Sequence, residues 1–149
     1  MTIQSILSLE TPVLPVEKMK AILPEAKKAY AQAKPFPHIV FDDFFEEEVL
    51  ERVLDEFPGA NDIEWVDYYD THQKKLANEN EENIGLFTRY VLYSLNSQIF
   101  LRFLEELSGI PALISDPTFR GGGLHNTLPG GKLGIHLDFN KHKKYDLDR

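Results

Sequence analysis

The chain has 149 residues, of which 42% are hydrophobic and 27% charged, and its formal net charge is −8. This length and composition fit one globular domain with a real hydrophobic core, and the acidic charge disfavours nucleic acid, whose phosphates would be repelled. The absence of cysteine excludes disulfides, thiolate catalysis and cysteine-rich zinc sites. No signal peptide and no apolar run of about 20 residues is evident, so we expect a cytoplasmic location and no membrane partner.

The first elements are predicted from helix formers and from a short β-branched run. Residues 16–34 are mostly helix formers and predict a helix that Pro24 breaks or restarts, since proline fits best in a first turn. The run 38–41 follows a proline pair, is β-branched and aromatic, and predicts a strand.

A second, amphipathic helix is predicted over 44–57. Apolar residues recur there every four positions, and a Pro-Gly pair follows. Asp43 is the expected cap of this helix, with Glu46 three residues later as its reciprocal partner.

The middle of the chain predicts a strand, a loop and a long helix. Residues 63–70 (IEWVDYYD) favour a strand, and the polar stretch 71–84 favours a loop or a short helix. The longest helical pattern covers 86–107, and Gly109 and Pro111 follow it as stop signals. One face of that helix carries a predicted apolar stripe of Leu92, Leu95, Ile99, Phe103 and Leu107.

The character of the chain changes after Pro117. The stretch TFRGGGLHNTLPGGKLGIHLDFN contains two short strand-like runs joined by PGG, which is typical of strand, turn and strand. We therefore expect one α+β domain over 1–149, with a helical lead-in (1–34), helix and strand support (35–116) and the start of a β-sheet core (117–149).

His136 and Asp138 are the candidate metal ligands. Residues i and i+2 of a strand project from the same face, so an imidazole and a carboxylate would lie side by side. Such a pair supplies two thirds of the two-histidine, one-carboxylate triad that holds non-haem Fe(II). The triplet alone is also common by chance, as two polar residues on a surface strand.

The wider context resembles the Fe(II)- and 2-oxoglutarate-dependent oxygenases, in particular their prolyl-hydroxylase-like branch. The resemblance rests on PFPHIVFDDFF followed by an amphipathic helix, on FLEELSGIP, and on GGGLH, PGG and H-x-D-F-N in sequence. It implies helices packed on the first strands of a double-stranded β-helix, a jelly-roll or cupin-like core that is incomplete in this chain.

The resemblance also implies site residues and cofactors. His136 and Asp138 match the first two iron ligands, and Thr127 falls where the family places a side chain facing the 2-oxoglutarate pocket. His125 has the same strand parity as Thr127 and is a second candidate for that pocket, although a histidine on a half-buried strand serves equally well as a structural residue. The implied cofactors are Fe(II) and 2-oxoglutarate, with ascorbate as a further candidate. The implied reaction is dioxygen-dependent hydroxylation of a C–H bond in a prolyl or other peptidyl residue or a small molecule.

The chain departs from the family after the H-x-D triplet. The family pattern needs a second histidine tens of residues later and then an arginine or lysine for the co-substrate carboxylate, whereas this sequence ends at Arg149. His142 is too close to His136 to be that distal ligand. We therefore expect the N-terminal portion of a longer oxygenase, inactive by itself. Two alternatives stay open: a non-catalytic binding or interaction domain with an incomplete metal centre, and, less favoured, a zinc or other metal hydrolase.

Overall fold

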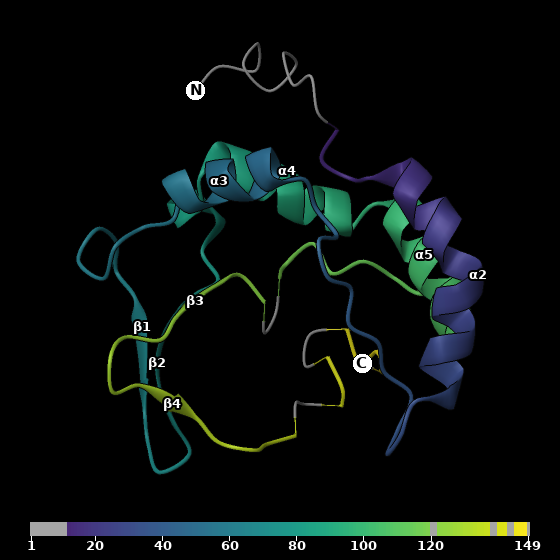
Figure 1. Cartoon of the computed structure of the whole chain (residues 1–149). Coiled ribbons are helices and arrows are strands. Elements are labelled where there is room, and N and C mark those ends of the chain that lie inside the picture. The colour runs from purple at the N-terminus through teal and green to yellow at the C-terminus, as the bar shows by residue number, and fades with distance from the viewer. Residues whose placement is uncertain (1–11, 120–121, 138–139, 143–144, 149) are drawn as a thin grey trace. The chain divides into compact units, whose positions relative to one another are not determined.

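The computed structural model of the chain describes residues 12–119, 122–137, 140–142 and 145–148. Over these residues the chain is α+β as predicted, with four α-helices and a small antiparallel sheet (Figure 1). It divides into two compact units: a helical unit within 1–57 and 85–117, and a sheet unit within 58–84 and 118–149. Each unit is described by itself, and the single domain expected over 1–149 stays a prediction. None of the helices in these ranges is long and apolar enough to cross a bilayer.

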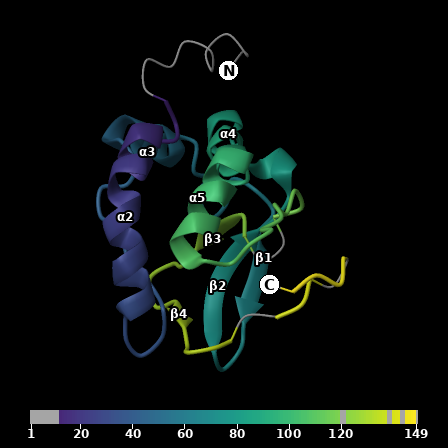
Figure 2. The ribbon, with the colours of Figure 1, turned by 90° about the vertical axis from the view of Figure 1, so that its right-hand side faces the viewer.

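Four helices build the helical unit. They are α2 (Val16–Gln32), α3 (Glu47–Asp55), α4 (Leu86–Leu95) and α5 (Gln98–Ser108). Helix α2 lies alongside α5, as Figure 2 shows, and α4 contacts both α3 and α5. Their apolar stripes pack on one another in two clusters, one around Leu14, Met19, Ala26, Phe103 and Leu107, the other around Val13, Val49, Phe87 and Val91.

Helix α2 runs through Pro24, so the predicted break at this proline is wrong. Pro24 is exposed, and the carbonyl that loses its helical hydrogen bond can therefore bind water instead. Met19 and Ala26, one on each side of the proline, are both buried in the first cluster and hold the two halves in one helix.

The segment between α2 and α3 differs from the predictions in two ways. Residues 38–41 form no strand, because Ile39 and Phe41 pack on the helical core while no other extended segment pairs with them among the described residues. Helix α3 begins at Glu47 and not at residue 44. Asp43 has a left-handed backbone with φ +52°, a conformation that aspartate tolerates better than most residues, so its side chain is no cap.

The helix predicted over 86–107 is two helices, α4 and α5. The Nδ2 of Asn96 donates to Leu92 O at 3.0 Å, which ends α4, and Ser97 Oγ accepts from Phe100 N at 3.4 Å, which begins α5. Short polar side chains compete with helical hydrogen bonds in this way. The end of α5 is as predicted, since Gly109 takes φ +76° and donates to Glu105 O.

The sheet unit contains four short strands. They are β1 (Val66–Tyr69), β2 (Gln73–Asn78), β3 (Leu124–Asn126) and β4 (Lys132–Leu133), with a 3-10 helix at Glu81–Asn83. Strand β1 lies inside the predicted strand 63–70. A loop or a short helix was predicted over 71–84: the 3-10 helix lies within that range, but strand β2 was not predicted. A tight turn brings the polar residues of β2 back along β1, with Tyr68 opposite Lys75.

Strands β3 and β4 do not form the hairpin that PGG suggested. Both pair antiparallel with β2, Ala77 opposite His125 and Lys74 opposite Lys132, so they are two parts of one partner strand. The intervening loop turns tightly: Gly131 N donates to Leu128 O at 2.7 Å and Gly130 has φ +79°, as a type II turn requires after Pro129.

Candidate functional site

His136 lies just beyond the sheet, three residues after the end of β4. The predicted strand ends here because its partner turns away: Gly134 N still donates to His72 O at 2.6 Å, but His72 belongs to the turn before β2. The His136 side chain is exposed, and its Nδ1 donates to Gly134 O at 2.9 Å. In a neutral imidazole, that hydrogen bond places the proton on Nδ1 and the lone pair on Nε2.

This arrangement fits one ligand position of a metal centre. In metal-binding histidines, the ring nitrogen that does not bind the metal usually donates its N–H to a carbonyl or carboxylate oxygen, as Nδ1 of His136 does to Gly134 O. Asp138 lies outside the described residues, so the face that its carboxylate shares with His136 stays a prediction. In the described ranges, which omit Asp138, no three His, Cys, Asp or Glu side chains form a metal-binding group. The donor set therefore fits Fe(II) in part only.

The two candidates for the co-substrate pocket do not share a strand face. His125 is the central residue of β3, whereas Thr127 lies beyond the end of β3 in the loop and is exposed. His125 Nδ1 is 3.1 Å from Lys75 Nζ, and its Nε2 is 3.2 Å from Gly122 O. Because an ammonium group only donates, Nδ1 accepts from Lys75 and Nε2 donates to Gly122.

Lys75 is the residue that the sequence analysis missed. It belongs to β2, which the polar composition of 71–84 concealed, and the register places it beside both His125 and Tyr68. A signal was present: Asp70, the last residue of the predicted strand, begins a turn, and the chain after that turn is long enough to form a second strand that pairs with the first. The side chain of Asp70 accepts from His72 N at 2.7 Å and Gln73 N at 2.9 Å and so closes that turn.

His142 lies in a tight turn of its own. The His142 ring stacks on Tyr145 with 4.7 Å between ring centroids, and the backbone N–H of His142 donates to Leu147 O at 2.8 Å.

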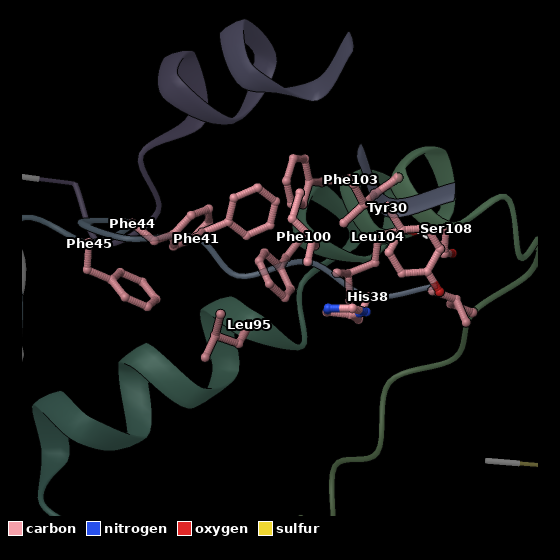
Figure 3. Close-up of a pocket in the computed structure, with 13 residues that line it drawn as sticks. Tyr30, His38, Phe41, Phe44, Phe45, Leu95, Phe100, Phe103, Leu104 and Ser108 are labelled. Carbon is pink, nitrogen blue, oxygen red and sulfur yellow. Dashed lines mark hydrogen bonds between the residues drawn. The ribbon is translucent and has the colours of Figure 1, made fainter. Parts of the chain in front are cut away.

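The helical unit has a cavity of about 640 Å³ (Figure 3). Five phenylalanines and five aliphatic side chains form most of its wall, and three polar side chains lie toward one end, namely Tyr30, His38 and Ser108. The Ser108 hydroxyl donates to Leu104 O at 2.7 Å, and His38 Nδ1 donates to Phe36 O at 2.8 Å. Among the residues that the structure describes, no Asp, Glu, Lys or Arg lines this cavity, so its chemistry suits an uncharged ligand with an apolar body.

Comparison of the chain with protein-family models, curated proteins and solved structures gave no match.

Proposed function

We propose that this chain is part of an Fe(II)- and 2-oxoglutarate-dependent dioxygenase that hydroxylates a C–H bond. His136 and Asp138 would hold the metal, and bound Fe(II) would supply the activation of dioxygen that couples decarboxylation of 2-oxoglutarate to hydroxylation. The observation that carries the proposal is the hydrogen bond from His136 Nδ1 to Gly134 O, which orients the imidazole with Nε2 as the ligand atom.

The surroundings of His136 add support. Ile135 and Leu137 on either side of it are fully exposed, at 105% and 97%. Apolar side chains as exposed as these are typical of a surface that another segment covers, as the facing sheet of a jelly roll would. The jelly-roll or cupin-like core belongs to this proposal, as do the third ligand and the co-substrate anchor in residues that follow Arg149. A peptidyl substrate, ascorbate as a further cofactor and a cytoplasmic location stay predictions.

The test is an anaerobic titration with Fe(II) and 2-oxoglutarate that follows the visible charge-transfer band of the complex. It uses this chain and a polypeptide that continues beyond Arg149 in its natural reading frame. We expect the band and succinate release in the longer polypeptide, and their loss in its His136→Ala and Asp138→Ala variants. His72→Ala is the matched control, since His72 is also an exposed histidine of the sheet unit.

The outcomes separate the elements of the proposal. Full succinate release by the Asp138→Ala variant would remove the H-x-D pair from the mechanism. Iron-dependent turnover by the 149-residue chain would show that its third ligand comes from within these residues. Loss of a first ligand should lower metal affinity at least as much as the 10–100-fold typical of outer-shell changes.

The second candidate is a non-catalytic binding domain, which the 640 Å³ cavity of the helical unit favours. Its aromatic wall and its polar end suit an uncharged aromatic ring with one hydroxyl group, which His38 and Tyr30 could bind by hydrogen bonds. Titration with 2-naphthol tests this function, with the Leu104→Phe variant to fill the cavity. Val40→Ala is the control, because Val40 is 77% exposed and does not line the cavity.

A further inference from the structure

A lysine, a histidine and a tyrosine meet on one face of the sheet. Antiparallel pairing places Tyr68 opposite Lys75 and His125 opposite Ala77. Because Lys75 and Ala77 are two residues apart on β2, the side chains of Tyr68, Lys75 and His125 project from the same face of the sheet. Lys75 Nζ is 3.1 Å from His125 Nδ1 and 5.8 Å from the centroid of the Tyr68 ring. The three side chains come from three adjacent strands and are therefore held by the sheet, not by a loop.

The cluster carries one positive charge without a carboxylate to neutralise it. Lys75 is half-buried and forms no ion pair in the part of the chain that the structure describes, whereas Lys20, Lys28 and Lys141 each lie within 3.3 Å of an acidic oxygen. His125 accepts from Lys75 and is thus neutral, so it adds no charge.

The free donors of this cluster match a single carboxylate group. An ammonium group has three N–H donors, and the contact with His125 uses one of them. Two remain for the two oxygens of a carboxylate, and hydrogen bonds between charged groups are the stronger ones. The ring of Tyr68 lies beside the ammonium and offers an apolar surface to the carbon atoms next to that carboxylate.

The neighbouring cavity limits the rest of the ligand. Tyr68 and Ala77 also line a cavity of about 410 Å³ together with Trp65 and Val66, and the rest of its wall is polar and includes Asn78, Asn80 and Asn83. An aromatic group can extend from the lysine along the apolar side of this cavity. Glu64 and Glu79 lie on its wall. Glu79 lies four positions after Lys75, so their Cα atoms are about 13 Å apart in extended chain. No ion pair joins the two side chains among the described residues. A second carboxylate entering the cavity would be repelled by these acids.

From this geometry we infer that Lys75, with His125 and Tyr68, forms a binding site for a small organic monocarboxylate whose apolar part lies along Tyr68. The carboxylate can belong to a free acid or to the C-terminus of a peptide. The inference uses no metal, so it stands independently of the proposed iron centre.

The test compares three probes in binding titrations followed by NMR with the whole chain: phenylacetate, its neutral isostere phenylacetamide, and the dicarboxylate succinate. We expect phenylacetate to bind about tenfold or more tightly than either of the others. The Lys75→Gln variant should bind phenylacetate and phenylacetamide equally weakly. Lys74→Gln is the matched control, because Lys74 is the next residue on the opposite face of β2, and it should bind like the wild type.

Three results would overturn the inference: no binding of phenylacetate, equal binding of phenylacetate by wild type and Lys75→Gln, or an equal loss in Lys74→Gln. An unchanged Trp65 fluorescence spectrum verifies that Lys75→Gln keeps the sheet folded, and Lys75→Arg, which keeps the charge, should retain most of the affinity. An acetylated tetrapeptide ending in phenylalanine distinguishes the two sources: tighter binding than phenylacetate indicates a peptide C-terminus, and weaker binding indicates a free acid.

Discussion

The side chain of Glu56 caps helix α4 from a distance of more than thirty residues along the chain. Its carboxylate accepts from Phe87 N at 3.1 Å, from Thr88 N at 2.8 Å and from the Thr88 hydroxyl at 3.0 Å. Phe87 and Thr88 are 0% and 5% exposed, so water replaces a lost acceptor poorly at these two residues. The negative charge also lies at the positive end of the helix dipole.

Replacing Glu56 should therefore destabilise the helical unit strongly. A buried N–H left without an acceptor costs about 1–3 kcal/mol, and loss of a helix cap costs about 0.5–2 kcal/mol. Because these terms overlap, we expect Glu56→Ala to lower the free energy of unfolding by about 2–4 kcal/mol. Glu56→Gln keeps one acceptor oxygen and should cost about half as much. Glu51→Ala, at an exposed position of helix α3, which ends just before Glu56, should change the free energy of unfolding by less than about 0.5 kcal/mol.

The measurement is urea unfolding followed by far-UV circular dichroism, which reports the helices, and by fluorescence of Trp65, the single tryptophan, which reports the sheet unit. A Glu56→Ala loss no greater than that of Glu51→Ala would refute the reasoning.

A second variant tests the contact itself. A Cβ at Gly85 would collide with the Glu56 carboxylate, so Gly85→Ala should displace that carboxylate. The double variant Gly85→Ala/Glu56→Ala should then lose less free energy of unfolding than the sum of the two single losses, because both changes remove the same hydrogen bonds.

Two further perturbations test other elements of the fold. Phe103 is 6% exposed in the first cluster, so Phe103→Ala should lower the free energy of unfolding by about 3–5 kcal/mol in the same urea assay. Ile99→Ala, at a position that is 56% exposed, should lower it far less. A loss below about 1 kcal/mol for Phe103→Ala would contradict this packing. The hydrogen bond from the His72 backbone, followed by those from Gln73, lowers the pKa of Asp70 below its ordinary value of 3.8. Since the pKa of Asp70 is lower in the folded state, its stabilisation is present above pH 3.8 and is lost as the pH falls through the folded pKa. Asp70→Asn should therefore make acid unfolding, followed by Trp65 fluorescence, less steep in that pH range. An acid unfolding curve unchanged by Asp70→Asn would argue against this role.

Sequence patterns predicted the helices well and their ends less well. Apolar periodicity is set by burial, so the helices within 16–34, 44–57 and 86–107 were found. The division of the last of these depends on two side chains, Asn96 and Ser97, that hydrogen bond to nearby backbone and are common inside helices too. The strand predicted over 38–41 failed because a β-branched run reports burial, whereas a strand also needs a partner.

The candidate site was predicted in part for a similar reason. The H-x-D triplet is local in sequence, so His136 could be named, and the structure adds the hydrogen bond that orients its ring. Lys75 could not be named, because its contact with His125 joins residues fifty positions apart and depends on the register of β2 with β3. No pattern in the polar stretch 71–84 fixes that register.

Because β3 and β4 pair with different parts of β2, the loop between β3 and β4 should tolerate insertions. Strand β3 pairs with the C-terminal half of β2 and strand β4 with its N-terminal end, so each register is fixed independently of the loop between them. Lengthening the chain between Thr127 and Pro129 would leave both pairings unchanged, and the loop residues there are exposed. A short peptide epitope or a spectroscopic label inserted at this point would therefore be displayed on the sheet unit without altering its strands.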